Sequence, residues 1–246
     1  MKHARGLICV AITQERSEEL KLNPMVNSNT SLHETNFTVS VDAKKNIATG
    51  ISAKDRWETL KIINDSSASP SDLARPGHMF PLIAKSGGVL RRAGHTEASI
   101  DLAKLAGFSS CSLLVEIVDE DGSMARLDRL KEISKEHDLR LISIAELIEY
   151  RRKKDKLITQ LLDIPFPNEY GEFRLRLFED SIHKDHHVAL IKGEISEEDE
   201  VLVRVHSQCL TGDIFGSLRC DCGPQLEESM KKIDLHGKGV LVYLRQ

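Results

Sequence analysis

The sequence predicts an α+β fold built from two tandem domains, each with a mixed sheet flanked by helices. Apolar residues at strand spacing and at helical spacing follow one another along the whole chain. A length of 246 residues is enough for two separate cores. Near the middle, the prolines of "DIPFPNE" separate a mixed first part from a strand-rich second part, because proline fits neither a helix interior nor a central strand.

The first domain is predicted to span residues 1–152. Its strands follow from runs rich in Val and Ile, and its helices from apolar residues on one face. In chain order we expect strands at 6–13 and 36–43, a helix capped by Ser52 and Asp55, and a loop from about Asn64 to Gly77. A helix near Ile100–Leu105 and a strand at 111–118 should follow. We then expect a helix with Leu127, Leu130 and Ile133 on one face, a strand at 139–144, and a helix capped by Ser143 and Glu146.

A linker is predicted over 153–169, with the second domain at 170–246. Residues 172–178, 187–193 and 200–206 alternate between apolar and polar side chains and are expected to be strands. A helix is expected from Pro224, a residue favoured at the first helical position, to Gly237, a natural stop. Its inner face would carry Leu226, Met230 and Ile233, and a last strand would follow at 239–244.

Composition excludes several classes of function. The net charge of −4 gives no field that would recruit nucleic acid or an anionic membrane. The apolar runs are shorter than the ~20 residues that a membrane span requires, and the first residues do not form a signal peptide. Five cysteines in a chain of this length indicate a reducing compartment, so we expect a cytoplasmic protein.

Three of the five cysteines lie close together, in "HSQCLTGDIFGSLRCDCG". Thiolates suit zinc, and the three ligands Cys209, Cys220 and Cys222 would leave a fourth position of a tetrahedral ion open for water. The alternatives are a closed structural site, with His206 as a possible fourth ligand, or unrelated free thiols. Spacing does not decide between them.

A second unusual passage, "KSGGVLRRAGHTEASIDLAKLAGF", belongs to the first domain. Arg92 can hold a phosphate in a forked geometry, Thr96 can add a hydroxyl donor, and His95 can bind a metal. His78 follows Pro76 and Gly77 in an expected rigid turn. Glu116 is an acid between apolar neighbours, where burial would raise its pKa and favour a role in proton transfer. Each of these residues also has a plain structural explanation.

The segment "RVHSQCLTGDIFGSLRCDCGPQL" closely resembles the zinc-binding signature of GTP cyclohydrolase II, which opens the imidazole ring of GTP. The resemblance implies that Cys209, Cys220 and Cys222 bind Zn²⁺, whose water attacks the guanine ring. It also implies GTP contacts along the stretch Arg204, Val205, His206, Ser207 and Gln208, and at Gln225. Gln208 stands where the family usually carries Glu, so the contact there loses a charge.

The strings "TVSVDA", "TGISAKDR", "RPGHMFPL", "GGVLRRAGHTEA" and "EIVDEDGSMARL" resemble 3,4-dihydroxy-2-butanone 4-phosphate synthase. This family converts ribulose 5-phosphate into a four-carbon riboflavin precursor and formate, uses Mg²⁺ or Mn²⁺, and is dimeric. The resemblance implies a homodimer in which His78 and Glu116 are catalytic and His95 binds the metal. The substrate contacts would be Arg92, Ala93, Gly94, His95 and Thr96, with Thr49 in a neighbouring loop.

The order of the two families matches the bifunctional riboflavin-biosynthesis enzyme of bacteria and of plant plastids, where the stroma would replace the cytoplasm. The first family carries an N-terminal acidic loop, and the second continues beyond "YLRQ", so we expect a chain truncated at both ends with an incomplete second domain. One rival hypothesis is a non-catalytic zinc-binding protein. Another is a partner-binding remnant within an oligomer of complete enzymes.

Overall fold

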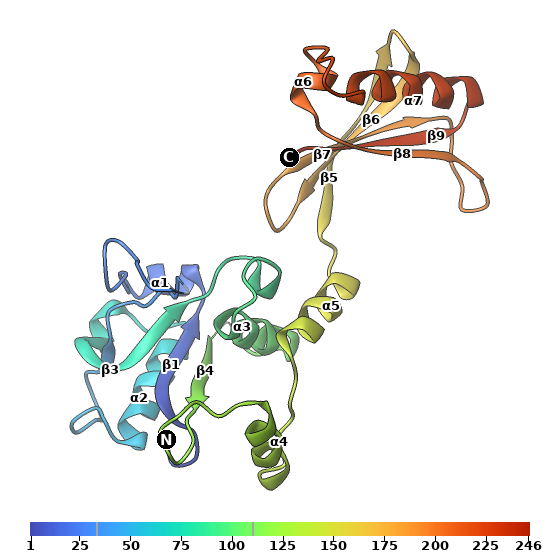
Figure 1. The fold of residues 1–246 in the computed structure, drawn as a ribbon. Coiled ribbons are helices and arrows are strands. Elements are labelled where there is room, and N and C mark those ends of the chain that lie inside the picture. The colour runs from blue at the N-terminus through green and yellow to red at the C-terminus, as the bar shows by residue number, and fades with distance from the viewer. Residues whose placement is uncertain (33, 110) are drawn as a thin grey trace. The chain divides into compact units, whose positions relative to one another are not determined.

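The computed structural model describes residues 1–32, 34–109 and 111–246. The chain divides into two compact units, unit 1 over Met1–Lys154 and unit 2 over Asp155–Gln246, each with its own sheet (Figure 1). Both sheets contain parallel and antiparallel pairs, which confirms the predicted α+β class. Among the described residues, none of the helices has both the length and the apolar character of a membrane span.

Unit 1 has a four-stranded sheet in the order β2-β3-β1-β4. The strands are β1 (Arg5–Ile12), β2 (Val41–Ala43), β3 (Leu73–Ile83) and β4 (Cys111–Ile117). The two central strands, β1 and β3, run parallel, with Cys9 paired to Phe80. β2 and β4 lie antiparallel to them at the two edges.

One face of this sheet forms the main core. Ile8, Val10 and Ile12 of β1 pack there with Met79 of β3 and with Ile63 of α2 (Ala53–Asn64). Each such buried side chain contributes roughly 1.5–3 kcal/mol. The predicted cap of α2 is present, since the Ser52 hydroxyl accepts from the Asp55 N–H at 3.1 Å. The short helix α1 (Gln14–Glu19) follows β1 directly.

The opposite face is covered only in part. Ile100 of α3 (His95–Leu105) packs on Ala11, with Leu114 beside them. α4 (Leu127–Glu136) and α5 (Ile144–Lys154) complete the unit, together with the 3-10 turns η1 (Pro70–Asp72) and η2 (Gly88–Leu90). Arg151 of α5 donates to the buried carboxylate of Asp101 at 2.8 Å, which fastens α5 to α3.

Unit 2 has a five-stranded sheet in the order β5-β6-β7-β9-β8. Its strands are β5 (Ile158–Asn168), β6 (Gly171–Asp180), β7 (His186–Lys192), β8 (Leu202–Ser207) and β9 (Gly239–Leu244). Figure 1 shows α7 (Cys222–His236) lying along this sheet, with the short α6 (Leu210–Asp213) near its first turn. Met230 and Ile233 of α7 pack on Phe173, Leu190 and Leu241.

Four local predictions were wrong. The linker expected over 153–169 is the strand β5 from Ile158 on, because its prolines lie in an edge strand, where a missing N–H is tolerated. The strand expected at 139–144 does not form, since these exposed residues have no neighbouring strand. The strand expected at 36–43 is reduced to Val41–Ala43, and the loop expected to run to Gly77 ends at Leu73.

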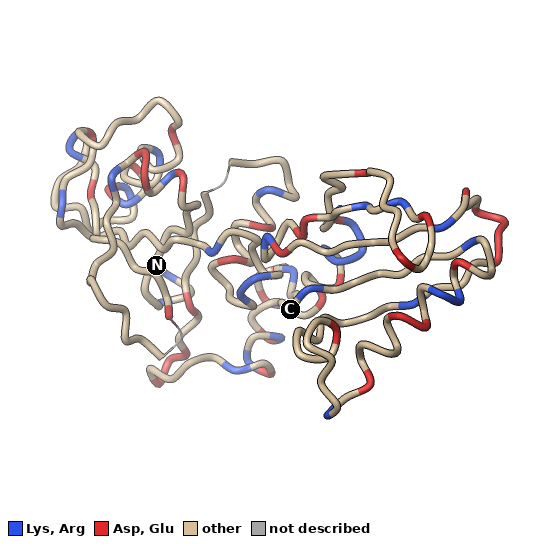
Figure 2. The backbone as a smooth tube through the Cα atoms, turned by 90° about the horizontal axis from the view of Figure 1, so that it is seen from above, with Lys and Arg blue, Asp and Glu red and all other residues tan. Residues whose placement is uncertain are grey.

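Figure 2 shows basic and acidic residues interspersed along both units. This mixture agrees with the small net charge of −4. Any anion must therefore be bound by local groups rather than by a field of one sign.

Candidate active sites

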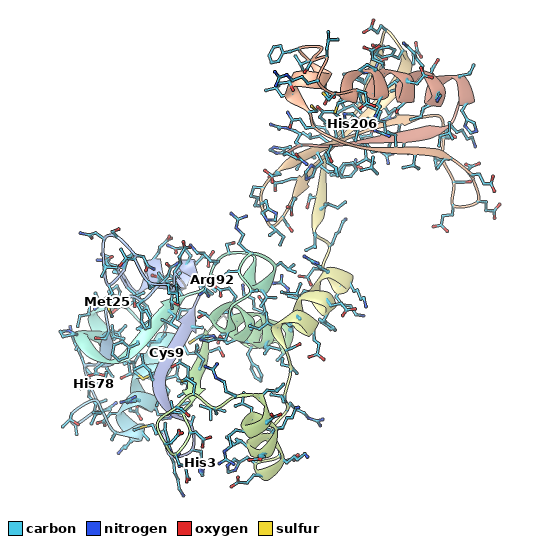
Figure 3. The ribbon with its side chains drawn as sticks, viewed as in Figure 1. His3, Cys9, Met25, His78, Arg92 and His206 are labelled. Carbon is cyan, nitrogen blue, oxygen red and sulfur yellow. The ribbon has the colours of Figure 1, made fainter. Side chains whose placement is uncertain are left out.

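The partly covered face of the unit 1 sheet brings distant residues together. Cys9 pairs with Phe80 on one side and with Leu114 on the other, so these side chains share a face. Because side chains alternate along a strand, His78 and Glu116 point to the same face. Figure 3 labels Cys9 between His78 and Arg92.

A hollow of about 470 Å³ lies on this face. It is lined by Arg92, Ala93, Gly94 and His95, by Glu116 from β4, and by apolar residues that include Cys9 and Leu82. Gly94 is the N-cap of α3 and His95 its first residue, so the free N–H groups of the first turn lie at the hollow. The structure thus joins four of the predicted substrate contacts to the predicted acid.

Arg92 is held in place by a buried partner. Its guanidinium donates to Glu97 Oε2 at 2.6 Å, and Glu97 is only 1% exposed. The other oxygen of Glu97 accepts from the Lys85 N–H at 3.0 Å. A side chain at Gly94 would collide with this pair, since its Cβ would lie 2.3 Å from the Arg92 guanidinium.

His78 lies on β3 rather than in the rigid turn that was predicted, and it pairs with Asp42 of β2. Asp42 Oδ2 is 2.7 Å from His78 Nδ1, and Asp42 Oδ1 accepts from the His78 N–H at 2.9 Å. Asp42 is 7% exposed, whereas the His78 side chain is 43% exposed. This pairing favours the tautomer with a proton on Nδ1, which leaves Nε2 as a free base.

The Thr49 loop comes next to this pair. Gly50, with a φ of +87°, packs against His78 Nδ1 and Asp42 Oδ2. Asp55 fixes the loop by accepting from the N–H groups of Ala48 and Gly50, at 3.3 and 3.1 Å. Thr49 itself is exposed.

Two predictions about side-chain environment need correction. Glu116 is exposed rather than buried, because it points to the open face of β4, so burial gives no argument for its role in proton transfer. Thr96 is 3% exposed and is not among the lining residues of the hollow, because its side chain is covered at the first turn of α3.

A magnesium site is not completed by the residues present in unit 1. His95 reaches the hollow, but in the described part of unit 1 no three metal-binding side chains converge. Mg²⁺ requires near-octahedral oxygen ligands, and one imidazole does not supply them. The predicted role of His95 as a metal ligand therefore stays a prediction.

In unit 2 the three cysteines do converge. The sulfurs of Cys209, Cys220 and Cys222 all lie within 4.8 Å of one another, and those of Cys209 and Cys220 are 3.8 Å apart. Gly212 packs against them so closely that a Cβ there would lie 2.8 Å from Cys220 Sγ. Three soft thiolates around one point fit Zn²⁺.

The three thiols differ in acidity. A hydrogen bond from the Gly212 N–H, assisted by those from Cys222 and Thr211, lowers the pKa of Cys209. Hydrogen bonds with Cys209 and then Cys220 raise the pKa of Cys222. Cys209 therefore ionises more readily than Cys222.

His206 is not grouped with these sulfurs. It is 3% exposed, and its Nε2 lies 3.0 Å from Asp213 Oδ1. The Tyr243 hydroxyl donates to Asp213 Oδ2 at 2.6 Å, and the two rings stack with centroids 5.5 Å apart. Burial, together with the hydrogen bond to Asp213, raises the pKa of Tyr243 to about 12. His206 does not join the three sulfurs in this structure, because its Nε2 is paired with Asp213, so a fourth zinc ligand at His206 stays a prediction.

The predicted GTP-contacting stretch alternates between the two faces of the sheet. Arg204 and His206 pair with Leu241 and Tyr243, on the face covered by α7, so Val205 and Ser207 point the other way. Arg204 donates to Gln225 Oε1 at 2.6 Å, which joins two of the predicted contacts. Gln208 has its N–H bonded to the Leu244 carbonyl at 2.7 Å.

Comparison with known proteins agrees with this geometry. The pattern of the family described as 3,4-dihydroxy-2-butanone 4-phosphate synthase matches residues 1–150. The chain belongs to this family. Residues 159–246 match a second enzyme family, GTP cyclohydrolase II.

Curated relatives resemble the chain over its whole length. "Riboflavin biosynthesis protein RibBA" of Chlorobium phaeovibrioides is 53% identical over 246 residues, which are 100% of this chain and 60% of that protein. The protein of the same name from Bacillus mycoides is 52% identical over 99% of this chain and 61% of its own length. The chain therefore spans about 60% of the length of these relatives.

Solved structures show the same architecture. RibBX, a two-domain 3,4-dihydroxy-2-butanone 4-phosphate synthase from A. baumannii, superposes with a TM-score of 0.74 and 37% identity, over 99% of this chain and 68% of its own. A synthase crystallised with two magnesium ions superposes with a TM-score of 0.60 and 38% identity, over 62% of this chain and 76% of its own.

Three residues of these sites were not singled out in the sequence analysis above. Asp42, Glu97 and Asp213 each hold another site residue by hydrogen bonds. Glu97 and Asp213 stand within five positions of the residue that they hold, which is a usable signal. Asp42 is 36 positions from His78, and only the pairing of β2 with β3 brings them together.

Proposed function

We propose that unit 1 binds ribulose 5-phosphate in the hollow and converts it into 3,4-dihydroxy-2-butanone 4-phosphate and formate, as a step of riboflavin biosynthesis. The observation that carries the proposal is the single hollow lined by Arg92, Gly94, His95 and Glu116. A sugar phosphate needs an anion site and groups that move protons, and this hollow offers both.

The phosphate would be bound at the first turn of α3. Its free N–H groups and the positive end of the helix favour an anion, and Arg92 adds a forked donor. Glu97 neutralises part of the Arg92 charge but fixes its direction. The Glu97 carboxylate therefore orients the Arg92 guanidinium but weakens its attraction for a phosphate.

His78 would remove the proton from the carbon beside the ketose carbonyl. Its Nδ1–H donates to Asp42, so Nε2 carries the lone pair that accepts this proton. Glu116, an exposed carboxylate on the same face, would return or relay protons.

The test is formate release. With excess Mg²⁺, the chain should form formate as ribulose 5-phosphate is consumed, and Arg92→Ala should lower kcat/KM mainly by raising KM, because it removes a binding contact. Formate production that is unchanged in Arg92→Ala would contradict the placement of the substrate in this hollow.

For unit 2 we propose zinc-dependent hydrolysis of GTP, with Cys209, Cys220 and Cys222 as the ligands. Zinc, when bound, supplies Lewis acidity for hydrolysis at neutral pH. Arg204 would bind the nucleotide, and one observation favours this: its Nε is buried without a hydrogen-bond partner among the described residues, as expected of a donor that awaits a ligand oxygen. Gln225 would hold the Arg204 side chain.

Chelation separates this proposal from a purely structural zinc protein. The unit 2 core, around Phe173, Leu190 and Leu241, does not include the cysteines. We therefore expect zinc removal to abolish GTP turnover while the far-UV circular dichroism of unit 2 is largely kept. Cooperative unfolding of unit 2 on chelation would instead support the structural alternative.

We propose a reducing, cytoplasmic setting, because five cysteines in a chain of this length are typical of one. We also propose a homodimer, as the resemblance implies. Size-exclusion chromatography with light scattering measures this directly.

A further inference from the structure

A buried carboxylate controls the position of the first cysteine. Asp213 Oδ2 accepts from the Cys209 N–H at 2.9 Å, and the Asp213 N–H donates to the Cys209 carbonyl at 2.7 Å. Both backbone groups of Cys209 are therefore held by one residue.

The same carboxylate is anchored to the sheet. Asp213 accepts from His206 of β8 at 3.0 Å and from Tyr243 of β9 at 2.6 Å, and its side chain is 3% exposed. β8 and β9 are neighbours, with His206 paired to Tyr243. Through Asp213, the backbone of Cys209 is thereby connected to the neighbouring strands β8 and β9.

One polar atom of this cluster has no hydrogen-bond partner among the described residues. When His206 Nε2 donates to Asp213, its Nδ1 is left as an acceptor, and Nδ1 is buried without a hydrogen-bond partner among the described residues. The cluster therefore keeps both oxygens of Asp213 paired, although one ring nitrogen of His206 is left without a partner.

Cys209 and Asp213 also bracket Gly212, the residue that packs against the sulfurs. A Cβ at Gly212 would lie 3.2 Å from Cys209 Sγ and 2.8 Å from Cys220 Sγ. A shift of the Cys209 backbone would therefore displace Gly212, which packs against the sulfurs, as well as the Cys209 thiol. Cys222, in contrast, is fixed by its own place at the start of α7.

We propose that Asp213 is the positioning residue of the three-cysteine site, holding Cys209 in the geometry that binds metal, with His206 and Tyr243 as its anchors. The inference rests on the proposed zinc-binding function of unit 2. Asp213 acts through the Cys209 backbone and is not a metal ligand.

The test uses the full chain with Asp213→Asn, which keeps the shape but replaces one oxygen with an amide donor that faces either the Cys209 N–H and the Tyr243 hydroxyl or His206 Nε2. The matched control is Asp199→Asn, which removes a carboxylate of the same unit that pairs with Lys238. Zinc affinity is measured by competition with a chelator, and the thiolate–metal absorption of the Co²⁺-loaded protein reports ligand geometry. We expect Asp213→Asn to bind zinc about 10–100-fold more weakly with an altered Co²⁺ spectrum. The control should match the wild type.

Unchanged zinc affinity and an unchanged Co²⁺ spectrum in folded Asp213→Asn would overturn the proposal. If Asp213→Asn does not fold, Tyr243→Phe decides, since it removes one anchor and keeps the ring stack. Weaker zinc binding in Tyr243→Phe supports the proposal, and wild-type binding overturns it.

Hydrogen exchange of the Cys209 amide, measured without metal, separates this inference from the proposed function. Protection in the wild type that is lost in Asp213→Asn supports the positioning role even if the wild type binds no zinc, in which case only the zinc function fails. Zinc binding by the wild type, with equal Cys209 protection in both proteins, would overturn the positioning role alone.

Discussion

Replacing Gly212 with alanine is expected to abolish zinc binding by unit 2. The added Cβ would lie 2.8 Å from Cys220 Sγ, 2.9 Å from Cys222 Cβ and 3.2 Å from Cys209 Sγ. All three ligands would have to move apart, whereas tetrahedral zinc requires each sulfur at ~2.3 Å from the ion. We expect the affinity to fall by more than about 100-fold, as measured by chelator competition.

The control for this substitution is Leu218→Ala, in the same loop, where the side chain is fully exposed. It should bind zinc like the wild type. Far-UV circular dichroism should stay unchanged in both variants, because neither residue belongs to the core of unit 2. Wild-type zinc affinity in Gly212→Ala would contradict the assignment of the three sulfurs as ligands of one zinc ion.

Asp42→Asn is expected to have the largest effect in unit 1. Asparagine keeps the acceptor for the His78 N–H but cannot accept a proton from Nδ1 with its amide nitrogen. The imidazole then favours the tautomer with a proton on Nε2, so the nitrogen proposed as the base no longer carries a lone pair. General base catalysis contributes about 10²–10⁴-fold, so we expect formate release from ribulose 5-phosphate to fall by at least about 10²-fold in kcat.

The tautomer can be followed independently of turnover. ¹⁵N chemical shifts of His78 should show a proton on Nδ1 in the wild type and on Nε2 in Asp42→Asn. Asp65→Asn is the matched control, because this carboxylate only accepts from Ser67 in an exposed turn. Normal turnover by Asp42→Asn would remove His78 from the proposed proton transfer.

The sequence was sufficient to predict most of the secondary structure. The runs at 6–13 and 239–244 are strands, and Leu226, Met230 and Ile233 do face the core, because one buried face imposes its period on the residues. The strand around His78 was missed because Pro76 and Gly77 are typical of a turn. The prolines of β5 led to the wrong prediction of a linker for a similar reason, since local composition does not show that a strand lies at the edge of a sheet.

Site residues could be predicted from the sequence where several of them lie together in one short segment. The cysteine cluster and Arg92–His95 each occupy one stretch of sequence, and the structure brings each together. Residues that act through others were not predictable, because Asp42 reaches His78 only through strand pairing. The faces taken by Glu116 and Thr96 also depend on packing that no local pattern records.

The most direct test of the central claim is a residue-resolved NMR titration of the chain with ribulose 5-phosphate. The claim is that the hollow on the open face of the unit 1 sheet is the substrate site. We predict that the amide signals of Arg92–His95 and Glu116 shift, together with the His78 ring, while unit 2 is unaffected. Shifts confined to other parts of the chain, or none at saturating sugar phosphate, would contradict the account.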